Sequence, residues 1–194
     1  MDSKVLIHGG CERKGIFFCS KIQNDFYLFD PAQNKWQTIA GPNWNMKPRL
    51  NQGYVWTGQH FVIWGGRSKS NLVENDGAVY NYQNKTWTLI SDQLPEGEKS
   101  RFAHKMIWDG KQILVFGGGH KLQEFAESTL SLYWSPKRPE YTAWKKVPSN
   151  LTPLGRRWHS QHWLDGELII WGGFGADQTY LPFGSRLTIP EVNE

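Results

Sequence analysis

Cysteines and long apolar runs are both scarce in this sequence. The two cysteines, Cys11 and Cys19, could bridge in an oxidising compartment or remain thiols in a reducing one, so they do not decide localisation. No segment approaches the roughly 18 consecutive apolar residues of a membrane-spanning helix, and the start, MDSKVLIHGG, lacks the apolar core of a signal peptide. We expect no membrane segment. The compartment stays open: cytoplasmic, or extracellular or periplasmic if these residues are part of a longer exported protein.

A strong excess of charge is missing too. Twenty-two Lys and Arg residues stand against 18 Asp and Glu residues, a formal net charge of +4, which is too weak to predict nucleic-acid binding. Hydrophobic residues make up 39% of the chain and aromatic residues 14%, with 11 tryptophans. A chain of 194 residues can bury a sizeable core. Because large aromatic side chains make up much of its apolar content, the composition favours β-structure.

A Gly-Gly pair after a short β-prone run recurs four times. The runs are VLIHGG, FVIWGG, ILVFGG and LIIWGG, ending at Gly10, Gly66, Gly118 and Gly173. The last three are preceded by an Arg with Gln or His three positions later, and that Gln or His stands 13 residues before the first Gly of the pair. These landmarks are Arg49 with Gln52, Arg101 with His104 and Arg156 with His159. A constant offset indicates a structural repeat.

Each full repeat predicts four β-strands. Thr57-Gly58, Asp109-Gly110 and Asp165-Gly166 are turns between the first two strands, because Gly adopts the positive φ of a tight hairpin turn. A Tyr-containing third strand then turns into a fourth that carries a Trp. Four strands in about 50 residues predict a propeller blade. We expect one propeller domain, or part of one, over residues 1–194, with repeat units at about 1–40, 41–92, 93–148 and 149–194.

Packing would explain most of the tryptophans. Sheets that radiate from an axis leave wedges that widen outward, and bulky rings fill such wedges. We therefore expect five tryptophans in the interfaces between blades: Trp36, Trp64, Trp87, Trp144 and Trp171. The Gly-Gly pair would end the second strand where neighbouring backbones crowd and a side chain would clash.

These motifs resemble the kelch repeat, whose hallmark is a Gly-Gly pair that closes the second strand, followed by a Tyr and a later Trp. The resemblance covers nearly the whole chain, and its Trp-rich form is similar to kelch repeats of bacterial surface and secreted proteins. It implies an all-β fold, a kelch-type β-propeller of four-stranded antiparallel blades. Galactose oxidase carries related repeats and binds copper, but this sequence identifies no such ligand set, and Gln52 at the position of His104 is a poor metal ligand. We predict no metal and no cofactor.

The two terminal repeats are incomplete. The first begins at VLIHGG without an Arg-containing strand before it, and the last offers SRLTI but no Trp-containing strand after Gly173. We expect three, four, four, and two or three strands. Open blade edges invite pairing with another chain. Three interpretations stay open: a fragment of a propeller of six or seven blades, a homo-oligomer whose edges complete one another, and a four-bladed ring closed by the C-terminal strand.

One face of the propeller is the candidate binding face, because the loops before each first strand and after each second strand open there. Arg49, Arg101 and Arg156 begin the innermost strands and are expected around the mouth of the central channel, where guanidinium groups can bind a carboxylate or an acidic peptide. The resemblance implies the same, since eukaryotic kelch domains that bind acidic peptides use arginines near this position. The alternative is a structural brace to backbone carbonyls or an acidic side chain, because the residue recurs in every such unit.

Residues that break the repeat are the other candidates on this face. Trp44, Arg157 and Trp158 fall outside the repeated pattern, and His104 and His159 follow the arginines. We predict a non-catalytic module that presents these residues to a protein, peptide or glycan. One alternative is a sugar-acting enzyme similar to kelch-type sialic acid mutarotases, with His104 or His159 moving protons; no acid–base pair is evident, so no catalytic residue is assigned. Another is a propeller fragment that self-assembles through its open edges.

Overall fold

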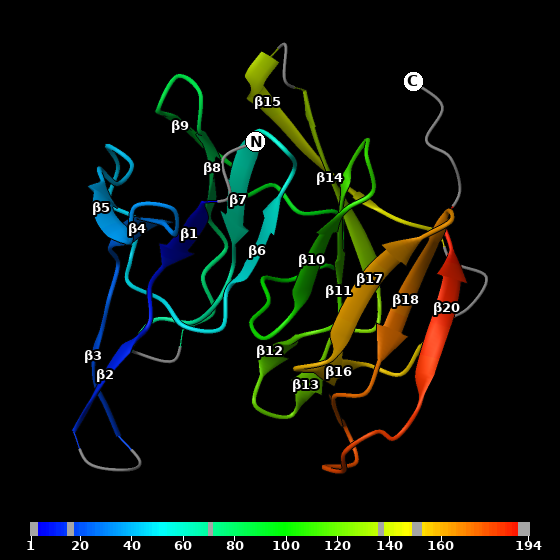
Figure 1. Cartoon of the computed structure of the whole chain (residues 1–194). Coiled ribbons are helices and arrows are strands. Elements are labelled where there is room, and N and C mark those ends of the chain that lie inside the picture. The colour runs from blue at the N-terminus through cyan, green and yellow to red at the C-terminus, as the bar shows by residue number, and fades with distance from the viewer. Residues whose placement is uncertain (1–3, 15–17, 70–71, 136–137, 149–152, 190–194) are drawn as a thin grey trace.

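The computed structural model describes residues 4–14, 18–69, 72–135, 138–148 and 153–189. All regular structure in these ranges is β-strand, and every strand pairing is antiparallel. Each repeat forms one sheet of three or four strands, and we call these sheets blades 1 to 4 in chain order (Figure 1). The described residues contain no helix that is long and apolar enough to cross a membrane.

In the described residues the blades contain three, four, four and three strands, which confirms the strand count expected from the sequence. Blade 1 comprises β1 (Val5–His8), β4 (Phe26–Asp30) and β5 (Lys35–Ile39). Blade 2 comprises β6 (Gly53–Trp56), β7 (His60–Trp64), β8 (Gly77–Asn81) and β9 (Thr86–Leu89). Blade 3 comprises β10 (Lys105–Trp108), β11 (Ile113–Phe116), β14 (Thr129–Ser135) and β15 (Arg138–Lys146). Blade 4 comprises β17 (Ser160–Leu164), β18 (Glu167–Trp171) and β20 (Gly184–Thr188).

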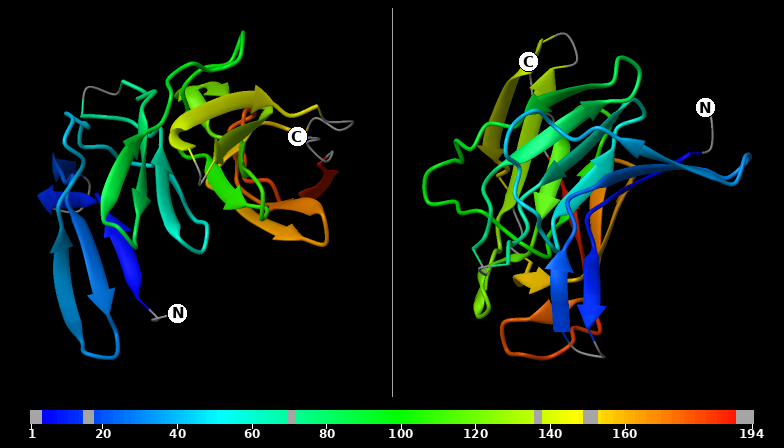
Figure 2. Two further views of the ribbon diagram at one scale, coloured as in Figure 1. Left: turned by 90° about the horizontal axis from the view of Figure 1, so that it is seen from above. Right: turned by 90° about the vertical axis from the view of Figure 1, so that its left-hand side faces the viewer.

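The blades follow one another along an arc, with blade 1 at one end and blade 4 at the other (Figure 2). The innermost strands β6, β10 and β17 pack side by side. The C-terminal strand β20 pairs with β18 as the third strand of blade 4. It therefore does not supply the strand that blade 1 lacks, and of the three interpretations left open, the four-bladed ring closed by this strand is wrong.

Backbone crowding explains the Gly-Gly pairs. Gly65 has a φ of +67°, and a Cβ on it would lie 2.5 Å from the carbonyl oxygen of Arg101 in the next blade. Gly117 repeats this relationship with the carbonyl oxygen of Arg156. A side chain at either position would meet both a strained backbone conformation and the neighbouring backbone. The predicted clash is therefore present between blades 2 and 3 and between blades 3 and 4.

Apolar wedges hold consecutive blades together. A cluster around Phe61 and Tyr80 lies between blades 1 and 2, a larger one joins blades 2 and 3, and a third joins blades 3 and 4. In the second cluster, Trp64 is fully buried, with its ring centroid 4.6 Å from that of Trp144. Trp36 and Trp171 depart from the expected wedge packing, because about 60% of each is exposed. They lie on the outer faces of blades 1 and 4, which no further blade covers in the described residues.

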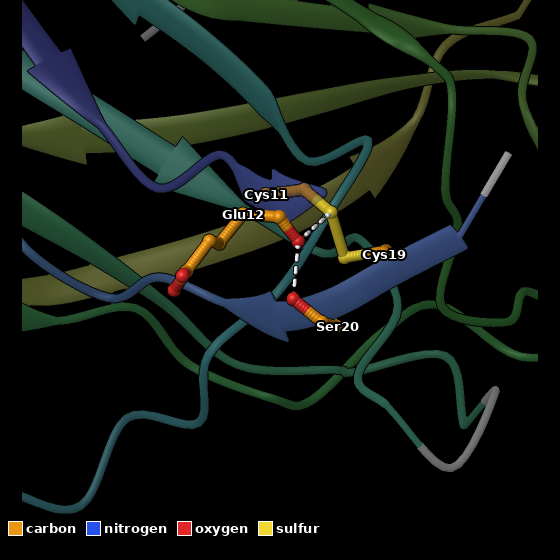
Figure 3. The surroundings of a disulfide bond; sticks show 4 residues. All are labelled: Cys11, Glu12, Cys19 and Ser20. Atoms are coloured by element: carbon orange, nitrogen blue, oxygen red, sulfur yellow. Dashed lines mark hydrogen bonds between the residues drawn. A yellow bond between two sulfur atoms is a disulfide. The ribbon is translucent and has the colours of Figure 1, made fainter. Parts of the chain in front are cut away.

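Two segments expected as loops form hairpins instead. β2 (Cys11–Lys14) pairs with β3 (Phe18–Ile22), and β12 (Gly119–Lys121) pairs with β13 (Glu124–Phe125). The first hairpin projects from blade 1 (Figure 1), and a disulfide between Cys11 and Cys19 crosses it (Figure 3). β16 (Arg156–Arg157) and β19 (Phe174–Gly175) make a further short pairing beside blade 4.

Candidate binding site at the channel mouth

The three repeat arginines lie inside the blades. Arg49, Arg101 and Arg156 have no exposed surface. In each, Nη1 donates to the carbonyl oxygen of the first Gly of the pair and to that of the residue just before the third strand. The acceptors are Gly65 and Asp76 for Arg49, Gly117 and Ser128 for Arg101, and Gly172 and Phe183 for Arg156, at 2.8–3.4 Å. These are the bonds expected if the arginines are a structural brace to backbone carbonyl groups. A role of the arginines in ligand binding stays a prediction.

The charge of these arginines is balanced differently in each blade. Arg49 pairs with the carboxylate of Asp76 at 2.8 Å, and Arg101 with that of Glu98 at 2.7 Å. Glu98 is itself buried, which alone would raise its pKa, but the hydroxyl of Ser128 and the positive charge of Arg101 outweigh burial and lower it. Arg156 stacks over the ring of Phe183, with its guanidinium carbon 5.4 Å from the ring centroid.

The two candidate histidines are packed between blades. His104 lies against Trp64 of blade 2, with ring centroids 5.1 Å apart, and His159 lies against Phe116 of blade 3 at 5.4 Å. Both are almost fully buried. Burial is the main cause that lowers the pKa of His104 to about 3 and that of His159 to about 4. They are therefore neutral at neutral pH and closed to bulk solvent, which does not favour the proton transfer that the sugar-acting alternative requires.

A chain of backbone hydrogen bonds crosses three blades just beyond the arginines. The N–H of Ala103 donates to the carbonyl oxygen of Asn51 at 2.7 Å, and the N–H of Trp158 donates to the carbonyl oxygen of Ala103 at 3.2 Å. All three residues have a φ of +56°. This left-handed conformation is uncommon for residues other than Gly and is kept only where the surroundings impose it. The inter-blade bonds thus fix the backbone of Asn51, Ala103 and Trp158.

A pocket of about 310 Å³ opens beside this chain. Its lining includes His8, Gln52, Tyr54, His104, Lys105 and Trp158. The side chain of Trp158 is more than half exposed, whereas His104 only borders the pocket from within the blade junction. Burial is the largest cause that lowers the pKa of His8 to about 4. Lys105 is therefore the one formal charge in the pocket lining at neutral pH.

The remaining predicted site residues are engaged in packing. Arg157 is almost fully buried, with its guanidinium carbon 4.6 Å from the ring centroid of Phe102 and 4.3 Å from that of Phe125. Trp44 is half-buried against the cluster between blades 1 and 2. The structure thus brings Trp158 and His104 to one pocket and places the other six candidates elsewhere. Sequence reasoning missed Lys105 and Tyr54, although each lies two or fewer residues from the start of an expected first strand.

Comparisons with known proteins identify the repeat. Residues 1–118 match the family model of the KLHDC2/KLHL20/DRC7 Kelch-repeats domain. Human Kelch domain-containing protein 3 is 29% identical over 184 residues, which cover 91% of this chain and 46% of that protein. Kelch domain-containing protein 10 from Xenopus tropicalis is 24% identical over 180 residues, 89% of this chain and 42% of that protein. Adagio-like protein 1 from rice (Oryza sativa subsp. japonica) is 28% identical over 136 residues, which cover 69% of this chain and 21% of that protein.

The chain spans less than half the length of these curated relatives. They come from animals and a plant, so the similarity to bacterial kelch repeats stays a prediction. The family model covers more than half of the chain, and blades 1 to 3 each carry the Gly-Gly pair, the third-strand Tyr and the fourth-strand Trp of the repeat. The chain belongs to the kelch-repeat family.

Proposed function

We propose that this chain is a non-catalytic interaction module that binds an acidic peptide segment of a partner protein at the channel mouth. The observation that carries the proposal is the position of Trp158. It is a largely exposed indole, held in the left-handed conformation by the hydrogen bond to Ala103, beside a pocket whose formal charge comes from Lys105.

Repeat comparison supports a recognition role for Trp158. The equivalent positions in blades 2 and 3 hold Asn51 and Ala103 in the same backbone conformation. Because the fold accepts a small or polar residue there, the indole is not required for the turn itself. Large rigid aromatic side chains are enriched among residues that dominate binding energy. An exposed Trp at a position where the scaffold tolerates Ala therefore points to a ligand contact.

The three repeat arginines have a different place in this proposal. They hold the backbone beneath the pocket, and the ligand meets Trp158 and Lys105 above them. Rigid support beneath a contact residue reduces the conformational entropy that is lost on binding. A sugar-acting reaction is less well supported, because its candidate proton carriers, His104 and His159, are buried.

Selection from a phage-displayed library of random 12-residue peptides tests the proposal. We expect enriched peptides to contain Asp or Glu and to bind with micromolar affinity in fluorescence anisotropy. Trp158→Ala is expected to weaken binding at least tenfold, the size typical of an interface hot spot, and Lys105→Glu is expected to abolish the preference for acidic peptides. Trp36→Ala is the matched control, an equally exposed Trp on the outer face of blade 1.

Two results would contradict the proposal. One is that Trp158→Ala and Trp36→Ala bind the enriched peptides equally well. The other is that selection enriches no sequence above the naive library. Thermal unfolding of both variants, measured in parallel, separates loss of a contact from loss of the fold.

A further inference from the structure

A disulfide-bonded hairpin adjoins the channel-mouth pocket. Cys11, the first residue of β2, follows Gly10, which lines the pocket together with His8. The returning strand β3 ends at Ile22, which lies opposite Cys11. Next to this pair, the N–H of Gln23 donates to the carbonyl oxygen of Gly10 at 3.0 Å. The base of the hairpin is therefore also part of the pocket wall.

The hairpin extends on the side of the molecule that carries the pocket. It follows the Gly-Gly pair of blade 1, as the hairpin β12–β13 follows that of blade 3. Both hairpins and the short strand β16 lie on the lower side in Figure 1. Trp158 comes directly after β16. The hairpin and the proposed ligand contact thus belong to the same side of the molecule.

The disulfide is open to a thiol reagent. Cys19 is exposed, whereas Cys11 is half-buried. Because access decides which sulfur of a disulfide is attacked, an incoming thiolate reaches the sulfur of Cys19 first. These are the two cysteines of the sequence. Thiol–disulfide exchange in residues 1–194 therefore takes place at this one hairpin.

Reduction of the bond does not require the blades to separate. None of the described side chains of β2 and β3 belongs to the three apolar clusters between the blades. The two cysteines are eight residues apart in sequence, and closing so short a loop stabilises a folded chain less than closing a long one. The bond can therefore break and form again while the wedges between the blades stay packed.

The hairpin has contacts that keep the two thiols near each other after reduction. The backbone pairing of Cys11 with Ile22 does not involve sulfur. The hydroxyl group of Ser20 donates to the carbonyl oxygen of Glu12 at 2.8 Å, and the sulfur of Cys11 lies 3.4 Å from the same oxygen (Figure 3). A thiol at Cys11 can donate to that carbonyl group. Both thiols thus remain within one hairpin, which favours re-oxidation.

Reduction does change how firmly the base of the hairpin is held. A pair of short strands is marginally stable without further support, and the disulfide is a covalent link between β2 and β3. Once it is broken, the hydrogen bond from Gln23 to Gly10 opens more often together with the hairpin. The pocket wall then has conformational freedom that a ligand must remove when it binds.

We propose that Cys11 and Cys19 form a reversible redox switch that regulates ligand affinity at the channel-mouth pocket. The disulfide form binds more tightly, because its pocket wall is already ordered. The inference rests on the proposed function, since the ligand is the acidic peptide segment inferred there.

A dithiol reductant supplies the two electrons of the reaction. Its thiolate attacks the sulfur of Cys19, the bond between the two cysteine sulfurs breaks, and the sulfur of Cys11 leaves and takes up a proton. The second thiolate of the reductant then attacks the mixed disulfide, and the sulfur of Cys19 leaves and takes up the second proton. The protein gains two thiols, and the reductant is oxidised to its own disulfide.

Hydrogen exchange tests the structural part of the inference without any ligand. The full chain is equilibrated with reduced or oxidised dithiothreitol, and alkylation reports the state of the cysteines. We expect reduction to speed exchange in residues 18–23 about tenfold, while exchange in β4 and β7 stays within about twofold. Cys11→Ser with Cys19→Ser should show the faster exchange under both conditions.

Peptide affinity tests the functional part. The probe is an acidic peptide enriched by the phage selection, titrated with both redox forms in fluorescence anisotropy. We expect reduction to weaken binding about fivefold, because the freed pocket wall must be ordered again, and oxidised dithiothreitol to restore the affinity. The cysteine-free double variant should bind like the reduced chain in either buffer. Trp36→Ala keeps both cysteines and should respond to reduction as the parent chain does.

Four outcomes would overturn the inference. Equal peptide affinity in the two redox forms would remove the regulation and leave the proposed function intact. Unchanged exchange in residues 18–23 would show that the disulfide does not order the hairpin. Failure of the bond to form again with oxidised dithiothreitol would exclude a reversible switch. If no selected peptide binds either redox form, the proposed function itself fails, and the inference fails with it.

Discussion

Trp144 donates its indole Nε1–H to the carbonyl oxygen of Ser91, just beyond the fourth strand of the preceding blade, at 2.8 Å. Trp87 makes the same bond to Ala40 one blade earlier, also at 2.8 Å. The conserved geometry explains why the fourth strand carries Trp rather than another large ring. Its ring fills the wedge, and its N–H satisfies a carbonyl group of the neighbouring blade.

The first prediction concerns this bond. Trp144→Phe keeps an aromatic ring but leaves the carbonyl group of Ser91 without its donor and the wedge underfilled. We expect the free energy of unfolding to fall by about 2 kcal/mol in urea titration. Trp36→Phe, at a largely exposed position on the outer face of blade 1, should change it by less than about 0.5 kcal/mol. Equal losses in the two variants would contradict the role given to the inter-blade bond.

Local spacing made the blades predictable from sequence. The Asp-Gly turns and Gly-Gly pairs each act within one hairpin, so they predict the order of the strands without any information on tertiary contacts. Asp165 and Gly166, for example, adopt the positive φ values of a primed turn, +50° and +83°. The burial of Trp36 and Trp171 was predicted wrongly, because burial depends on whether a neighbouring blade is present. No local pattern carries that information.

The candidate site was harder to predict for a similar reason. The offset of Arg156 from its Gly-Gly pair showed that it repeats, but not that its Nη1 would turn toward the carbonyl groups of Gly172 and Phe183. Those acceptors come from segments 16 and 27 residues away. Trp158 was identified from sequence because it breaks the repeat. Its left-handed backbone conformation could not be predicted, because a hydrogen bond to another blade imposes it and Trp is not a residue that favours it.

The second prediction is that the repeat arginines stabilise the fold. Arg156→Ala would leave the carbonyl group of Gly172 without its guanidinium donor and that of Phe183 with only the N–H of Gly172. A buried group that loses its hydrogen bond costs about 1–3 kcal/mol. We expect a loss of about 3 kcal/mol in the free energy of unfolding. Arg186→Ala removes a mostly exposed arginine that pairs with Glu167 in the same blade and should cost less than about 1 kcal/mol.

An opposite result for Arg156→Ala would be informative. If stability stayed unchanged while binding of the selected acidic peptides was lost, the arginine would be a ligand contact, and the structural brace would be wrong. Measuring both quantities on one protein preparation keeps the two roles separate.

The third prediction is acid sensitivity that arises from His104. Its pKa is lowered to about 3 in the folded chain, against about 6.5 when unfolded. Below pH 6.5 the unfolded chain binds a proton that the folded chain does not, so stability falls as the pH falls. Between pH 7 and pH 5 this amounts to about 2 kcal/mol for one such histidine.

His104→Gln tests this assignment, because Gln52 occupies the equivalent position of blade 2. We expect the variant to lose about 2 kcal/mol less stability than the parent chain between pH 7 and pH 5, measured by urea titration at each pH. His162→Gln, at an exposed position of blade 4, is the control for the His-to-Gln substitution itself. An unchanged pH dependence in His104→Gln would rule out His104 as the source of the acid sensitivity.

The fourth prediction is that the disulfide acts on one hairpin and leaves the blades as they are. Cys11 and Cys19 join β2 to β3 (Figure 3), and none of the described side chains of these strands belongs to the three apolar clusters that hold the blades together. Removing the bond should therefore open the hairpin locally while the wedges keep the blades folded. We expect Cys11→Ser with Cys19→Ser to change Tm by less than about 3 °C and to raise hydrogen exchange in β2 and β3 but not in β4. A much larger fall in Tm would place the hairpin inside the cooperative unit.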